Sequence, residues 1–182
     1  GQLVGENQRR GKDAPEFELI DTGAFDDDRY FDVVLEYAKR SPTDMLMRIT
    51  VHNRGPEAAE VHVLSQLWFR NTWSWGYPGV KPDLALDGEG DAVIARAGEL
   101  GVYRLYRDGQ APWLFTENES NTERLWGQRN RSPFVKDSFH RYVINGETQT
   151  INPEKNGTKA AARYLLEVPA EGSPIVRLRL AA

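Results

Sequence analysis

Apolar and polar side chains alternate with a period of two along this chain, and this alternation constrains the fold more than any other feature. In a β-strand, successive side chains point to opposite faces, so each alternating stretch predicts a strand with one face on a core. The third stretch also carries Leu64 and Trp68 on its other face, which favours burial on both sides. The alternating residues are Phe31, Val33, Leu35 and Tyr37; Met45, Met47, Ile49 and Val51; and Val61, Val63, Ser65, Leu67 and Phe69.

Shorter strand candidates follow, and turn residues such as Asp108-Gly109 separate them. One stretch has a helical period instead: Ser132-Pro133 is typical of a helix start, and Asn145-Gly146 of a helix end. We therefore predict an all-β sandwich of antiparallel strands with one short helix near 133–144 packed on the sheets. The other predicted strands are 16–20, 82–86, 92–97, 100–107, 112–116, 163–168 and 175–180, with loops at 1–15 and 21–29.

Composition excludes several classes of function. The 182 residues fit one domain, and the absence of cysteine excludes disulfides and thiolate metal ligands. A net charge of −4, with both signs interspersed, argues against a nucleic-acid or anionic-membrane partner. No apolar run is long enough to span a bilayer, and no signal peptide is visible. We predict a cytoplasmic protein without a metal or cofactor, since phosphate-binding glycine loops and a nucleophile elbow are also missing.

Residues 69–76, directly after the third strand, are the first candidate for a binding site. Trp73 and Trp75 lie close together in a predicted loop, where their rings can stack on a sugar while Arg70 and Asn71 hydrogen-bond to its hydroxyls. The alternative is that both rings close the end of the sandwich or fill a domain interface.

Residues 115–123 form the second candidate. Glu117 and Glu119 share a side of an extended chain, with Asn118 between them. A pair of carboxylates is what hydrolysis of a glycosidic bond needs, although their separation decides whether they can act. The alternative is an ordinary polar surface.

The third candidate lies on the predicted helix, where Lys136 and Asp137 precede His140. Asp137 and His140 stand at positions i and i+3, so a carboxylate can orient an imidazole that acts as a general base. The alternative is a surface ion pair or a polar contact to a neighbouring domain.

These stretches belong to an ordered series of motifs that resembles bacterial proteins of glycoside hydrolase family 63. The series covers most of the chain from about residue 6 onward. It consists of 20–26 (IDTGAFD), 30–33 (YFDV), 67–75 (LWFRNTWSW), 115–119 (FTENE), 133–140 (PFVKDSFH), 152–153 (NP) and 157–161 (GTKAA).

The resemblance implies a sandwich of the super-sandwich type that is followed, in the family, by an (α/α)6 toroid. That toroid carries both catalytic acids and cleaves α-glucosidic bonds with inversion. Residues 1–182 are then one sandwich domain, a fragment of a larger bacterial hydrolase, inactive alone. Its partners are the catalytic domain of the same parent chain and an α-glucoside or oligosaccharide. No catalytic residue is carried over, and the pocket-rim or interface candidates are Arg70, Asn71, Trp73, Trp75, Glu117, Asn118, Glu119, Lys136, Asp137 and His140.

Two other functions stay open at this point. The chain can be a free-standing carbohydrate-binding module with the two tryptophans as its platform. It can also be a mutarotase-like sugar epimerase that uses His140 with Glu117 or Glu119. Because the parent's neighbouring strands would be missing from a fragment, we also expect exposed apolar faces and self-association of the chain.

Overall fold

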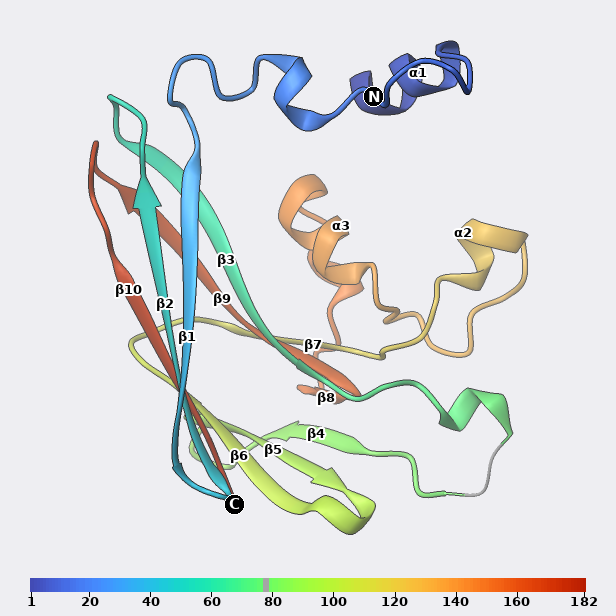
Figure 1. The fold of residues 1–182 in the computed structure, drawn as a ribbon. Helices are drawn as coiled ribbons and strands as arrows, with labels where there is room; N and C mark the ends of the chain where they lie inside the picture. The colour runs from blue at the N-terminus through green and yellow to red at the C-terminus, as the bar shows by residue number, and fades with distance from the viewer. Residues whose placement is uncertain (77–78) are drawn as a thin grey trace.

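A computed structural model describes residues 1–76 and 79–182, whose strands form two antiparallel sheets (Figure 1). The larger sheet has seven strands in the order β1-β2-β10-β6-β5-β4-β8, and the smaller has three in the order β3-β9-β7. This arrangement confirms the predicted all-β, sandwich-like fold. The strands are β1 (Phe31–Ser41), β2 (Asp44–Asn53), β3 (Ala59–Trp68), β4 (Asp83–Leu86), β5 (Ala92–Ala97), β6 (Gly101–Arg107), β7 (Trp113–Thr116), β8 (Asn156–Gly157), β9 (Lys159–Val168) and β10 (Ile175–Ala181).

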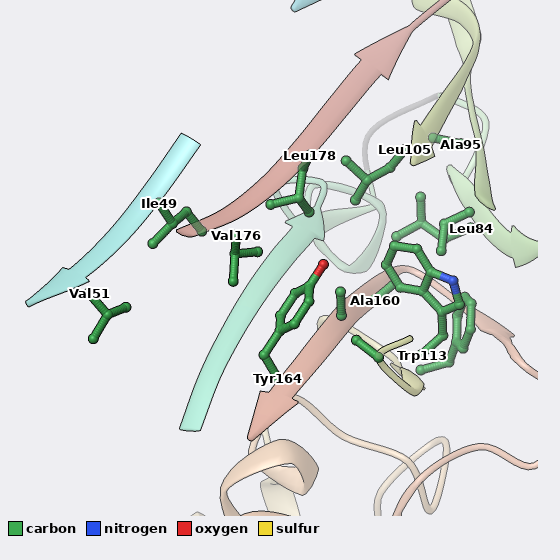
Figure 2. Packing of buried hydrophobic residues seen from close by; sticks show 14 of the residues in the cluster. Ile49, Val51, Leu84, Ala95, Leu105, Trp113, Ala160, Tyr164, Val176 and Leu178 are labelled. Carbon is green, nitrogen blue, oxygen red and sulfur yellow. The ribbon is translucent and has the colours of Figure 1, made fainter. Parts of the chain in front are cut away.

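The main core lies between the two sheets (Figure 2). On the smaller sheet, each large ring of β7 faces a small residue of β9: Trp113 is opposite Ala162, and Phe115 is opposite Ala160. This alternation of large and small side chains lets the residues of the two strands pack closely. The larger sheet contributes Ile49, Val51, Leu84, Val93, Ala95, Leu105, Val176 and Leu178 to the same core.

The outer face of the smaller sheet is covered by α3 (Ser138–Asn145). Phe139 of this helix packs with Leu114 of β7 and Ala161 of β9 in a second, smaller core. The molecule therefore has a third layer on this side, where α2 (Thr122–Trp126) also lies (Figure 1).

The helix on the smaller sheet starts later than predicted, at Ser138 rather than near Pro133. The backbone of the preceding residues bonds to β7 and its extension instead of to a helix. The carbonyl of Phe134 accepts from the Glu117 amide at 3.0 Å, and that of Val135 accepts from Thr116 Oγ1 at 2.8 Å. A helix start at Pro133 would lose both bonds.

The N-terminal prediction is wrong for residues 2–9 and for the strand at 16–20, whereas residues 23–29 form turns and a loop as predicted. Residues Gln2–Arg9 form helix α1, and Leu19–Thr22 form the 3₁₀-helix η1 in place of the strand at 16–20. Local side-chain bonds favour this conformation: the side chains of Glu18 and Asp21 cap η1 reciprocally, and Asn7 holds the backbone of Phe17 with two hydrogen bonds. The helix α1 buries none of its residues, so this segment adds nothing to the sandwich core.

The alternation in β1 places only Phe31 against the core, so the prediction for this strand holds only in part. Val33 and Leu35 are each 49% exposed and Tyr37 is 64% exposed, although they lie on the same face of the sheet as the buried Val51 and Ile49 of β2. The smaller sheet is too narrow to cover this edge. In the third predicted strand, β3, Leu64 packs in the second core but Trp68 is exposed, so burial on both sides holds only in part.

Within the described ranges, no helix is long and apolar enough to cross a membrane.

Candidate functional site

The three candidate stretches meet on one side of the molecule, next to the end of the smaller sheet. Asn118 is the centre of this meeting point. Its amide donates to Thr158 Oγ1 at 2.8 Å, its side chain donates to the carbonyl of Phe69 at 2.8 Å, and its own carbonyl accepts from Asn71 Nδ2 at 3.1 Å. Asn118 is only 9% exposed, so its bonds fix the loop after β3 to the loop after β7.

Trp73 is anchored in the same way. It belongs to the 3₁₀-helix η2 (Trp73–Trp75), and its indole Nε1 donates to Glu119 Oε1 at 3.0 Å. The Glu119 carbonyl accepts from the amide of Lys136 at 2.9 Å, which ties the third stretch to the other two. The indole N–H of Trp73 and the Oε1 oxygen of Glu119 are therefore used in a structural contact.

Glu117 is held by two partners. Lys81 Nζ lies 3.0 Å from Glu117 Oε1, and Thr158 donates its hydroxyl to Glu117 Oε2 at 2.6 Å. These contacts hold Glu117 in place as a paired carboxylate.

Asp137 does not orient His140 in the way the i, i+3 spacing suggests. Its carboxylate accepts from Asn121 Nδ2 at 3.1 Å and pairs with Arg124 at 3.3 Å, which joins the start of α3 to α2. His140 is exposed and lines an open cleft between the two helices.

Asn130 organises the loop between these helices. Its side-chain oxygen accepts from the amides of Thr122 and Glu123 and from the Thr122 hydroxyl, while its Nδ2 donates to Asn121 Oδ1. One side chain thus satisfies the free amides at the start of α2 and shapes the loop that carries Arg129 and Arg131.

Two hollows open on this surface. A cleft of about 820 Å³ between α2 and α3 is lined by His140, Arg124 and Arg141. A second hollow of about 320 Å³ lies between the tryptophan loop and α2, and its lining includes Asn71, Glu119 and Trp126. Arg129 and Arg131 line both, so the two hollows are neighbours.

Exposed aromatic rings stand on the same side. Trp75 is 54% exposed, with the Arg70 guanidinium 5.2 Å from its ring centroid, and Trp126 is 64% exposed. An exposed ring next to amide, carboxylate and guanidinium groups can stack on a sugar or pack against a protein surface.

The amine of Lys159 carries the one pKa shift among these groups that burial dominates. Its Nζ donates to the Lys136 carbonyl at 3.3 Å and lies 4.8 Å from the Phe139 ring centroid. Burial lowers the pKa of Lys159, and the charge of Lys136 lowers it further. Through this hydrogen bond, Lys159 joins β9 to the segment before α3.

Sequence reasoning missed several residues of this surface. Trp126, Asn130, Arg129 and Arg131 lie in a segment without periodicity, and Lys81 is distant in sequence from Glu117. Only the 157–161 motif pointed to Thr158 and Lys159. In the part of the chain that the structure describes, no group of three or more His, Asp or Glu side chains is arranged to hold a metal ion.

Comparison with known proteins gives one clear similarity. No family model matches the chain. The chain is 32% identical over 197 residues to the uncharacterized protein YMR196W of Saccharomyces cerevisiae. The similarity extends over 90% of this chain but only 18% of the yeast protein, so the chain spans less than a fifth of that relative's length.

Proposed function

We propose that this chain is the non-catalytic sandwich domain of a family 63-like glycoside hydrolase of the α-glucosidase class. Its role is to pack on the catalytic toroid of the same parent chain and to shape the rim of the substrate pocket. The observation that carries the proposal is the bonded network around Asn118, which joins three distant motifs into one surface that still exposes Trp75 and Trp126. A fixed surface of this kind can hold pocket groups in position, and small misplacements of such groups are costly in rate.

The yeast relative supports the modular part of the proposal. Its similarity to this chain is confined to 18% of its length, as is expected for one module of a larger protein. The resemblance of the ordered motifs to family 63 supports the other element of the proposal, namely that the parent protein is an α-glucosidase.

Hydrolysis assays test this proposal at two levels. We expect no turnover of maltose or p-nitrophenyl α-glucoside by residues 1–182 alone. In the protein encoded by the whole reading frame, we expect activity that falls about tenfold or more when Trp126→Ala disturbs the rim.

Trp68→Ala is the matched control, because Trp68 is also exposed (53%) but lines neither hollow. Turnover by the isolated chain that survives repurification would overturn the proposal. So would a reading frame that stops directly after Ala182.

A free-standing carbohydrate-binding module is the second candidate, and the smaller hollow favours it. Its exposed Trp126 stands beside Asn71, Gln128 and Glu119, a set that can stack on a sugar ring and hydrogen-bond to its hydroxyls. Titration with gluco- and manno-oligosaccharides distinguishes this function. A binding module made of residues 1–182 should bind them without any other domain. Its affinity should fall in Trp126→Ala and stay unchanged in Trp68→Ala.

The epimerase alternative gains no support from the geometry. His140 lines the cleft and Glu119 the smaller hollow, and among the described residues no hydrogen bond or ion pair joins His140 to Glu119 or Glu117. Polarimetry of aldose anomerisation remains its test.

A further inference from the structure

β1 ends the larger sheet and leaves one side of its backbone open. Within the residues that the structure describes, β1 pairs only with β2. It runs for 11 residues without glycine or proline, so it is a long edge strand of the kind that readily accepts another strand.

The direction of its free backbone groups follows from the neighbouring strands. The amides of Val51 and Asn53 on β2 donate away from β1, to the carbonyls of Pro174 and Gly172 at 3.1 and 3.0 Å. Val33 and Phe31, which stand opposite them, therefore direct their own amides and carbonyls away from β2. By alternation, the odd-numbered residues Phe31 to Tyr37 present free donors and acceptors at the edge.

The same odd-numbered residues carry the uncovered apolar row. Val33, Leu35 and Tyr37 continue the core face of the larger sheet beyond β2 and are 49%, 49% and 64% exposed. The free edge and the apolar row thus coincide.

We propose that the chain forms a two-fold dimer in which β1 pairs antiparallel with β1 of a second copy, centred on Leu35. An axis perpendicular to the sheet keeps the core faces of both copies on one side. Leu35 then stands opposite Leu35 of the second copy, and Val33 opposite Tyr37 of the second copy. Cross-strand pairs of aromatic and β-branched residues are favourable, and the uncovered rows of the two copies lie against each other.

The charges along β1 favour this partner and this direction. The strand is acidic in its first part, with Asp32 and Glu36, and basic at its end, with Lys39 and Arg40. Antiparallel pairing sets the acidic part of one strand beside the basic end of the other, whereas parallel pairing sets like charges side by side. Glu36 already contacts Arg48 of β2, and Asp32 contacts Arg54 directly after β2, but both carboxylates remain about half exposed and accessible to a second strand.

The centre of the pairing also follows from charge. With Leu35 at the centre, Glu36 stands opposite Val34 of the second copy and Asp32 opposite Ala38 of the second copy. A centre at Glu36 would set two glutamates directly opposite each other, which is unfavourable.

Light scattering and sedimentation over a range of concentrations test the dimer. We expect the mass to rise toward twice 20.7 kDa. Leu35→Lys introduces a charge into the apolar row and is expected to raise the dissociation constant tenfold or more. Leu165→Lys is the matched control, because Leu165 lies on β9 with the same exposed fraction of 49% and should leave the constant unchanged.

Cysteine cross-linking tests the centre of the pairing without interference, because the chain has no cysteine of its own. Under mild oxidation, Leu35→Cys should form a covalent dimer and Leu165→Cys should not. Circular dichroism of each reduced variant establishes that it is folded. A monomer at all concentrations, a dimer that Leu35→Lys leaves intact, or faster cross-linking through Glu36→Cys than through Leu35→Cys would overturn the proposal.

Discussion

β1 and β2 carry the same alternation of apolar side chains, yet the structure buries only one of them. Val33 and Leu35 stand opposite Val51 and Ile49, but the β1 residues are each 49% exposed, whereas the β2 residues are 0% and 4% exposed. The smaller sheet covers these β2 residues but leaves Val33 and Leu35 about half exposed. An alternating pattern therefore determines which face of a strand is apolar, while the neighbouring layer determines whether that face is buried.

The motif-bearing side of the molecule differs from the β1 edge in a second way. Around Asn118 the polar side chains have found partners inside the chain, and Trp73 and Glu117 are held by specific bonds. At β1 the free groups are backbone amides and apolar side chains. We call the first side closed because its polar groups are bonded within the chain, although the rings of Trp75 and Trp126 remain exposed there, and we call the second side open because the backbone edge of β1 is unpaired in the described residues.

The largest expected effect is the loss of unfolding free energy when a buried aromatic ring is removed, compared with the loss when an exposed ring of β1 is removed. Phe115 of β7 is fully buried between the sheets, so Phe115→Ala should cost about 3–5 kcal/mol of unfolding free energy through lost burial and a cavity. Tyr37→Ala on β1 should cost less than about 0.5 kcal/mol, since the ring is uncovered. Urea unfolding at low protein concentration measures both, and equal losses would break the comparison.

Gly157 tests how closely the backbone is packed on the closed side. It has φ of 154°, and a Cβ there would stand 2.4 Å from the carbonyl oxygen of Thr116, which belongs to the rigid β7 backbone. Gly157→Ala should therefore cost about 1–3 kcal/mol or more. Gly109→Ala, also at positive φ but in open space, is the control that separates the clash from conformational strain. Similar urea midpoints for the two variants would contradict the close approach.

Most of the strands could be predicted from sequence, because alternation and turn residues are local signals. β2, β5, β6 and β10 lie within one or two residues of their expected places. The position of an edge could not be predicted, since it depends on the width of the opposite sheet. The helix start could not be predicted either, because the carbonyls of Phe134 and Val135 are bonded to partners far away in the sequence.

The sequence predicted which segments form the candidate site, but it did not predict which residues of these segments contact each other. Composition pointed to Trp73, Glu119 and Lys136, and the structure joins them. The sequence did not indicate that the Trp73 indole would be hydrogen-bonded or that Trp126 would be the more exposed ring. The hydrogen bond of Trp73 joins residues 46 positions apart, which a local pattern cannot reveal.

The bond between Trp73 and Glu119 gives an intermediate effect. Trp73→Phe keeps an aromatic ring but removes the indole donor, leaving the carboxylate without its partner at 3.0 Å. We expect a loss of about 1–2 kcal/mol, typical of a partly exposed bond to a charged group. Trp126→Phe should leave the unfolding free energy nearly unchanged, because no hydrogen bond is seen for its indole in the described structure. A loss confined to Trp126→Phe would reverse the assignment of anchored and exposed rings.

The smallest effect concerns the ion pair of Asp44 and Arg179, which joins β2 to β10. Asp44, at the start of β2, accepts from Arg179 Nε and Nη2 at 2.8 Å each. These hydrogen bonds lower the pKa of Asp44, against a smaller opposing effect of burial. Because the folded-state pKa lies below the ordinary value of 3.8, the stabilisation is fully present above that value and is lost as the pH falls through the folded-state pKa.

Asp44→Asn should therefore lower the urea midpoint at pH 7 and flatten its decline between about pH 4 and 2. Asp108→Asn is the control, since Asp108 pairs with Arg177 at 3.5 Å with 58% of its side chain exposed, and solvent weakens such a pair. If both variants keep the acid limb of the wild type, the pair between Asp44 and Arg179 contributes nothing to the pH dependence of stability. The polar contacts near the open edge would then be the exposed pairs of Glu36 with Arg48 and of Asp32 with Arg54.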